Sequence, residues 1–164
     1  MLFRSRTNID AKNKYFISLL VGNEILGGGA GSILFNNVRE KESLCYYINS
    51  FIFIFKGIVF VQSGIEFENY EKVVKHIKET IQTIKNGQFN DKQLDIAINS
   101  LCKKYKGIVD YNTATIDYYY TNYLLNIDMD IDSIIEKIKS VKKEDIKKSF
   151  ENIWIDTCYF MKGE

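Results

Sequence analysis

The sequence predicts an α+β domain in which an antiparallel sheet is covered by helices on one face. Three observations support this fold class. Residues 46–55 and 58–65 are rich in β-branched and aromatic side chains, which favour strands. Beyond Glu68 the apolar residues recur at helical spacing through most of the remaining chain. Residues 154–161 then alternate again, so a strand returns to the sheet after the helices.

The chain before the two strands is predicted to hold one short strand and two helices. Residues 1–7 have room for one strand at most. A helix is predicted over 10–26, and it ends at 27–29 because three consecutive glycines cannot continue a stable helix. Ser32 then begins a second helix. Between the two strands, Lys56-Gly57 is typical of a two-residue hairpin turn.

Two long amphipathic helices are predicted next. The first has four apolar residues at i, i+4, i+8 and i+11 and ends at Asn86-Gly87; these are Val73, Ile77, Ile81 and Ile84. Asn90, with Gln93 three residues later, is typical of a capping box and begins the second.

Three shorter helices complete the block. One is predicted over 115–125. Another runs from Ser133, with Glu136 as its capping-box partner, to Lys139. The last is predicted over 144–152.

Length and composition limit the classes of function. The 164 residues fit one domain, spanning 1–164, and the short opening suggests the back portion of a larger unit truncated at its N-terminus. Lysine and arginine number 22 against 21 acidic residues, so the net charge of +1 gives no reason to expect nucleic acid or an anionic membrane as partner.

The cysteines and the apolar runs indicate the compartment. Cys45, Cys102 and Cys158 are odd in number and far apart, which argues against a disulfide framework and a structural zinc knuckle. No apolar run approaches the roughly 20 residues that span a bilayer, and no signal peptide is recognisable. Cytoplasmic residence is therefore the expectation.

His76, the only histidine of the sequence, is the first candidate for a metal ligand. An inverted zinc motif needs His-x-x-Glu-His, so that two imidazoles share one helix face, and Thr80 stands where the second should be. One imidazole without a nearby cysteine cannot build a zinc site, so no metal and no cofactor are expected. A solvated histidine on the polar side of a helix is the preferred interpretation.

Other candidate sites have simpler explanations. The glycines at 27–31 follow a helix rather than a strand, so a tight corner between helices is favoured over a phosphate-binding loop. No serine or cysteine nucleophile has a credible base, and no catalytic residue is assigned. The aspartates at 128, 130 and 132 are expected to cap helices. The lysine clusters, which include Lys103-Lys104, are expected on solvated surface. The tyrosine group is expected in core or interface, and it consists of Tyr118, Tyr119, Tyr120 and Tyr123.

Arg39 and Tyr46 are the remaining candidates, because both can point out of the folded unit. From spacing alone, Arg39 is expected to pair with Glu40 or Glu42 on its own helix, and Tyr46 to be an ordinary strand aromatic.

The stretch from Gly27 to Tyr46 favours a functional role for Arg39 and Tyr46 over these ordinary roles. LGGGAGSILF at 26–35, followed by VREK at 38–41 and LCY at 44–46, resembles the signature of the insulinase, pitrilysin and mitochondrial processing peptidase family, in its second, zinc-free domain. The resemblance extends through the hairpin, 63–65, 87–89 and 141–146, and so covers nearly the whole chain.

The resemblance implies a non-catalytic domain that encloses or binds a peptide opposite a homologous zinc-bearing domain or subunit. Related α+β domains form a clam-shell, and an arginine and a tyrosine seven positions apart reach the peptide backbone near the metal. Arg39 and Tyr46 match that pair. Cys45 departs from the family pattern, which has glycine or alanine there. By itself the chain would be no enzyme, at most an accessory part of a metalloendopeptidase.

The resemblance is closest to a bacterial branch with a degenerate zinc motif that is associated with modification of elongation factor P. The alternative function is therefore a pseudoenzyme interaction or scaffold module in such an assembly. The peptide, the partner and homo-oligomerisation stay open.

Overall fold

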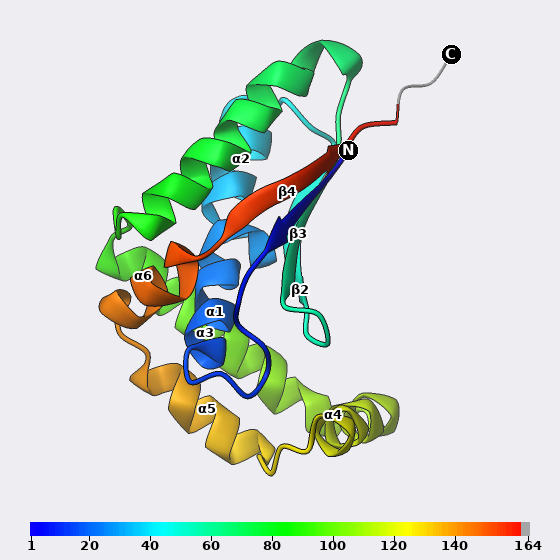
Figure 1. Cartoon of the computed structure of the whole chain (residues 1–164), viewed down its shortest axis with the longest axis vertical. Helices are drawn as coiled ribbons and strands as arrows, with labels where there is room; N and C mark the ends of the chain where they lie inside the picture. Colours follow the sequence, from blue (N-terminus) through cyan, green and yellow to red (C-terminus); the bar gives the residue numbers. More distant parts are fainter. Residues whose placement is uncertain (162–164) are drawn as a thin grey trace.

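The computed structural model describes residues 1–161, and it has the predicted α+β architecture (Figure 1). A four-stranded antiparallel sheet has the order β2-β3-β1-β4, so the first strand lies inside the sheet and the last forms an edge. The strands are β1 (Leu2–Arg6), β2 (Tyr47–Phe53), β3 (Ile58–Gly64) and β4 (Trp154–Tyr159).

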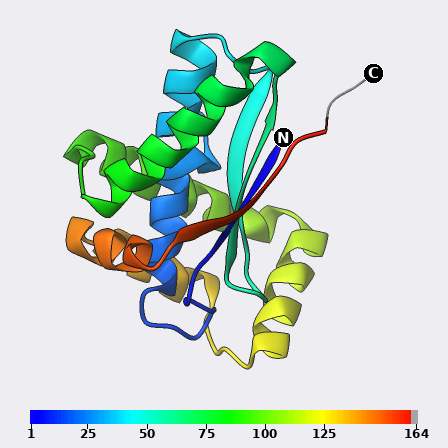
Figure 2. The same ribbon diagram turned by 45° about the horizontal axis from the view of Figure 1, so that its top comes forward.

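The helices follow the predicted order. In the two views the ribbon places α1, α2, α3 and α6 on one side of the sheet, whereas α4 lies apart, near the tip of the β2–β3 hairpin (Figures 1 and 2). The helices are α1 (Phe16–Asn23), α2 (Tyr70–Lys85), α3 (Asp91–Lys106), α4 (Asn112–Leu125), α5 (Ile131–Ser140) and α6 (Lys143–Glu151). The shorter turns are the π-helical η1 (Glu24–Gly28) and η2 (Phe35–Lys41) and the 3₁₀ turns η3 (Phe67–Asn69) and η4 (Gly107–Asp110).

Alternation along the strands determines which face of the sheet is covered. Ile48 and Ser50 on β2 and Val59 and Val61 on β3 are buried under the helices. The intervening residues of β2 point away from the helices and are exposed, and Phe51 stacks on Phe60 of β3 with ring centroids 5.3 Å apart. Because successive strand residues point to opposite faces, one face forms the core and the other stays accessible.

The first predicted helix is shorter than expected. Residues 10–15 form turns instead, because the side chains of Asp10 and Asn13 accept hydrogen bonds from the backbone of Lys12 and Tyr15, both at 2.9 Å. Such side-chain bonds compete with helical ones. The helix α1 is then continued by the π-helical turn η1 up to the glycines.

Two further predictions need correction. The cap of α5 is Asp130, whose carboxylate accepts from Ser133 N at 2.7 Å, and not Ser133 itself. Hydrogen bonding to the Ser133 side chain, and then to its backbone N–H, lowers the pKa of Asp130. In the tyrosine group, expected in core or interface, Tyr119, Tyr120 and Tyr123 are exposed, so they are not core residues of this domain. The predicted capping box at Asn90 and Gln93 is confirmed.

Candidate functional site

The glycine-rich corner is built around a buried carboxylate. Glu24, in η1, has a side chain only 4% exposed, and Lys104 on α3 approaches both of its oxygens to 2.8 Å. Ser100 Oγ donates to Glu24 Oε1 at 2.7 Å. Lys104 Nζ also donates to Gly28 O at 2.9 Å. The Lys104 ammonium thus holds the glycine-rich corner against α3. The expectation that the Lys103-Lys104 cluster is merely solvated is therefore wrong for Lys104.

Glu24 explains why glycines follow it. A Cβ added at Gly28 would lie 2.5 Å from Glu24 Oε2, and one at Gly29 would lie 2.7 Å from Oε1. The carboxylate therefore occupies the space that side chains at these positions would need. The predicted tight corner is confirmed, but its cause is the returning Glu24 side chain as well as close backbone packing.

The corner leads directly into the helix that carries Arg39. Ser32 Oγ accepts from Phe35 N at 3.3 Å, as expected for a helix start. The helix η2 ends where Ser43 adopts a left-handed conformation with φ of 51°. Leu44 N then donates to Val38 O at 2.9 Å and turns the chain back towards β2.

Arg39 does not make the ion pair that spacing suggested. Its Cζ atom lies 5.0 Å from the centroid of the Phe35 ring, one turn earlier on the same helix. Within residues 1–161 it forms no salt bridge with Glu40 or Glu42; Glu42 Oε1 instead lies 3.1 Å from His76 Nε2 on α2. The guanidinium is exposed and no carboxylate of residues 1–161 pairs with it, so its donors are accessible in this part of the chain.

Tyr46 stands immediately before β2. Its side chain is 86% exposed, while its backbone N donates to Gly64 O at 2.8 Å. Asn69 Nδ2 holds the preceding segment by donating to Leu44 O at 3.1 Å. The phenol is therefore presented to solvent from a backbone fixed on both sides.

Cys45 links the two candidates. Burial raises the pKa of its thiol, whereas a hydrogen bond with Ser63 and the charge of Arg39 act in the opposite direction. Cys45 thus responds to the charge of Arg39 and directly precedes Tyr46 in the chain. Cys45 packs partly against the core, so the departure from the family pattern is accommodated.

His76 is only partly solvated, because its side chain is 23% exposed and faces Glu42. Thr80, at the position of the missing second imidazole, is buried and donates to His76 O at 2.7 Å. Over residues 1–161 no group of three or more His, Cys, Asp or Glu side chains is arranged to hold a metal ion. Over the same residues no helix is long and apolar enough to cross a bilayer.

Comparison with known proteins identifies the family. Residues 9–101, more than half of the chain, match the model described as the peptidase M16 inactive domain. The chain belongs to this family. It is thus an inactive peptidase-like domain related to the insulinase group, as the glycine-to-tyrosine stretch predicted.

Relatives of this M16 inactive domain are longer proteins. It is 37% identical over 158 residues to the "Probable inactive metalloprotease YmfF" of Bacillus subtilis strain 168, covering 96% of this chain and 37% of the relative. A conserved protein of Enterococcus faecalis V583 superposes with a TM-score of 0.86 at 29% identity, over 94% of this chain and 36% of that one. The peptidase M16 inactive domain from Pseudomonas fluorescens gives 0.78 at 22% identity, over 94% and 39%, and supports the fold.

Sequence reasoning missed Glu24. A glutamate near the end of an apolar helix carries no signal of burial, and its partner Lys104 lies 80 residues further along the chain. Of the α4 tyrosines, Tyr118 borders a pocket that no local pattern in the sequence indicates.

Proposed function

We propose that this M16 inactive domain encloses a peptide opposite a zinc-bearing domain or subunit, with Arg39 and Tyr46 contacting the peptide backbone. The observation that carries the proposal is the exposure of both side chains, together with the lack of a carboxylate partner for Arg39 within residues 1–161. Two exposed hydrogen-bond donors suit a peptide carbonyl, which only accepts hydrogen bonds.

The chemistry of the pair fits this role. A guanidinium and a phenol can donate to the same peptide carbonyl and stabilise the negative charge that develops on its oxygen during hydrolysis. Phe35 lies under Arg39 and restricts the guanidinium, which lowers the entropy lost on binding. Any hydrolytic water would be activated by the zinc-bearing partner; the residues described here bind and orient.

The test is kinetic and uses a complex reconstituted with a zinc-bearing homologue. Arg39→Ala or Tyr46→Phe is expected to lower kcat/KM by about 30-fold, equivalent to about 2 kcal/mol of transition-state stabilisation. Lys41→Ala, an exposed cation on the same helix, and Tyr159→Phe, an exposed phenol on β4, are the matched controls and should leave kcat/KM unchanged.

The alternative is an interaction or scaffold module without peptide chemistry, such as one in a bacterial assembly that modifies elongation factor P. The accessible aromatic face of the sheet, with Phe51 stacked on Phe60, favours a partner contact of this kind. Intact assembly with kinetics unchanged by either variant would support the module and count against peptide contact by Arg39 and Tyr46.

A further inference from the structure

The helix α4 is unusual for this domain because none of its 14 residues is buried. Its outer side nevertheless carries large apolar and aromatic side chains, which are exposed in the domain as it stands. They are Ile116, Tyr119, Tyr120, Tyr123 and Leu124. These side chains form an exposed apolar surface on α4 that is separate from the lining of the pocket beside the helix.

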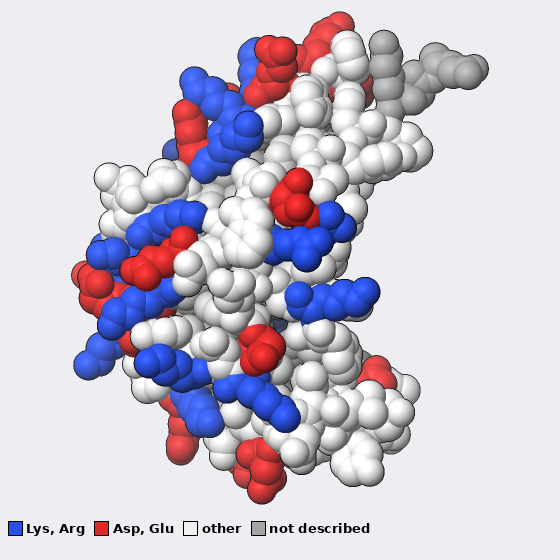
Figure 3. Space-filling model, viewed as in Figure 1, with Lys and Arg blue, Asp and Glu red and all other residues white. Residues whose placement is uncertain are grey.

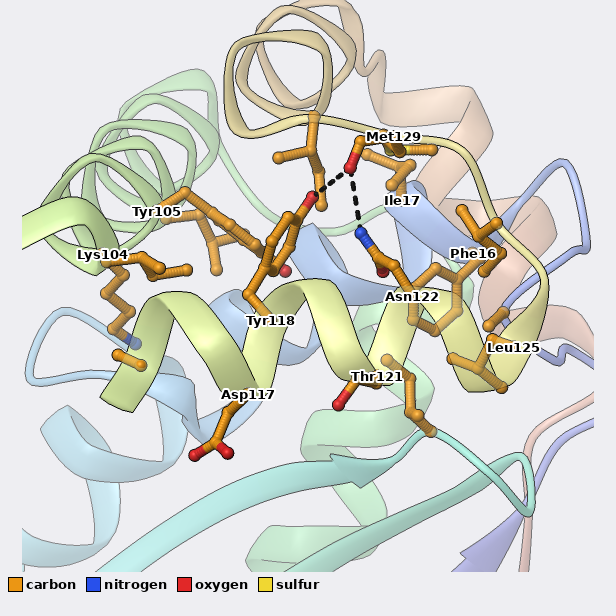
Figure 4. A pocket seen from close by; sticks show the side chains of 17 residues that line it. Phe16, Ile17, Lys104, Tyr105, Asp117, Tyr118, Thr121, Asn122, Leu125 and Met129 are labelled. Carbon is orange, nitrogen blue, oxygen red and sulfur yellow. Dashed lines mark hydrogen bonds between the residues drawn. The ribbon is translucent and has the colours of Figure 1, made fainter. Parts of the chain in front are cut away.

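A pocket separates α4 from the body of the domain. It has a volume of about 540 Å³ and lies between α4, α3, α5 and the start of α1 (Figure 4). Leu125 and Tyr118 of α4 border it on one side, and Phe16, Leu101 and Ile134 border it on the other. This volume and largely apolar lining are typical of a ligand or side-chain binding site.

Polar groups hold the pocket open rather than filling it. Tyr118 Oη and Asn122 Nδ2 both donate to the carbonyl oxygen of Met129, at 3.1 and 2.9 Å, and tie α4 to the segment before α5 (Figure 4). Burial raises the pKa of Tyr105, on the wall formed by α3, to about 12. The pocket is thus formed by the chain itself, and its largely apolar lining favours an apolar side chain.

Two charged side chains line the pocket, Lys104 and Asp117, and the Lys104 ammonium is already held by Glu24. Between Gly107 and Glu136 the sequence has no lysine or arginine, although the chain contains 22. The same segment has six carboxylates, all exposed and none in an ion pair within residues 1–161. They are Asp110, Asp117, Asp128, Asp130, Asp132 and Glu136. In the view of Figure 3, lysine and arginine gather mainly over the helices at the left, and the surface at the lower right, over α4, shows uncharged and acidic side chains.

From this combination we propose that α4 and its pocket bind a basic amphipathic segment of a partner protein. Apolar side chains of the segment enter the pocket, and its lysines or arginines face the surrounding carboxylates. Charge complementarity of this kind sets specificity and the rate of association, while the buried apolar contact supplies the affinity. The site is distinct from Arg39 and Tyr46 and does not depend on their role.

Two synthetic peptides probe the site in the full 164-residue chain. One has leucine and lysine at amphipathic helical spacing over about 15 residues, and the other has glutamate in place of every lysine. Fluorescence anisotropy is expected to show the lysine peptide binding at least about tenfold more tightly than the glutamate peptide, with the difference shrinking as salt is added.

Two variants locate the binding. Ala114→Trp fills the pocket from α4 and should abolish binding of the lysine peptide, with circular dichroism checking the fold. The triple variant Asp117→Asn, Asp128→Asn, Asp132→Asn keeps the shape of these surface residues and should weaken binding about tenfold. The matched control neutralises three exposed carboxylates elsewhere, Glu66→Gln, Asp95→Asn and Glu151→Gln, and should bind like the unmodified chain.

Three results would overturn the proposal. The first is equal binding of the two peptides, and the second is binding that survives both the pocket and the charge variants. The third is sedimentation showing that the chain dimerises through α4 and that Ala114→Trp dissociates the dimer, because a second copy would then be the occupant. Arg39→Ala should leave peptide binding at this site unchanged, which separates this test from the kinetic one.

Discussion

Lys104 Nζ lies 2.8 Å from both carboxylate oxygens of Glu24, across 80 residues of sequence. Glu24 is almost fully buried, whereas the Lys104 side chain is 51% exposed. The ammonium therefore compensates a carboxylate that cannot reach solvent. This pair fixes the glycine-rich corner, which in turn directs the helix of Arg39.

Removing the ammonium should destabilise the domain. Lys104→Met leaves the Glu24 charge buried with Ser100 as its remaining side-chain donor, and we expect a loss of about 2 kcal/mol in the free energy of unfolding. Lys103→Met, at the neighbouring exposed position, is the control and should change stability little. Urea unfolding measures both, and equal values for the two variants would contradict the role assigned to Lys104.

A methyl group in the corner should have a similar effect. Gly28→Ala places a Cβ 2.5 Å from Glu24 Oε2, so the carboxylate must leave its partners, and we expect about 1–3 kcal/mol of destabilisation. Gly107→Ala is the matched control, because nothing lies within 4 Å of its Cβ and its φ is −72°. That variant should be neutral or more stable by about 0.5 kcal/mol. A harmless Gly28→Ala would show that Glu24 does not dictate the glycine.

The edge strand β4 should loosen in acid. The hydrogen bond from Arg6, together with the neighbouring Arg4, lowers the pKa of Asp156. The folded chain therefore keeps this carboxylate ionised to a lower pH than the unfolded chain. Its contribution to stability is present above the unfolded-state pKa of about 4 and is lost as the pH falls through the lowered folded-state value.

Asp156→Asn tests this pH dependence. The stability difference between the unmodified chain and the variant should be measurable at neutral pH and should vanish near pH 2. Asp95→Asn, at an exposed position without an ion pair in residues 1–161, should show no such pH-dependent difference. A difference that persists unchanged into acid would exclude the charge of Asp156 as its origin.

The purified chain should contain no stoichiometric zinc. His76 faces Glu42, and Thr80 stands at the position of the second imidazole, so one nitrogen ligand is available on this helix. Metal analysis after dialysis, with His76→Ala as the comparison, checks this. One tightly held zinc per chain that the variant loses, or peptide hydrolysis abolished by a chelator, would refute the prediction.

Local signals were sufficient for most of the fold. The capping box at Asn90 and the apolar spacing from Val73 to Ile84 each gave an element that the structure has. The hairpin was also predicted, but its loop spans residues 54–57 rather than Lys56-Gly57 alone, because Phe53 pairs with Ile58. The boundaries of α1 and α5 were predicted less well. Asp10, Asn13 and Asp130 bond to nearby backbone in ways that periodicity does not distinguish from helix.

The sequence by itself determined the order of the elements and the apolar faces of most of them, because periodicity and short motifs are local properties. Its resemblance to the insulinase group singled out Arg39 and Tyr46 as the candidate pair, which stays a prediction. Only the tertiary structure shows that Glu24 is buried against Lys104. It also shows that Arg39 lies over Phe35 without a carboxylate partner in residues 1–161, and that an apolar pocket lies between α4 and the other helices. These features depend on side-chain packing, much of it between residues far apart in the chain, and spacing along the sequence carries no record of it.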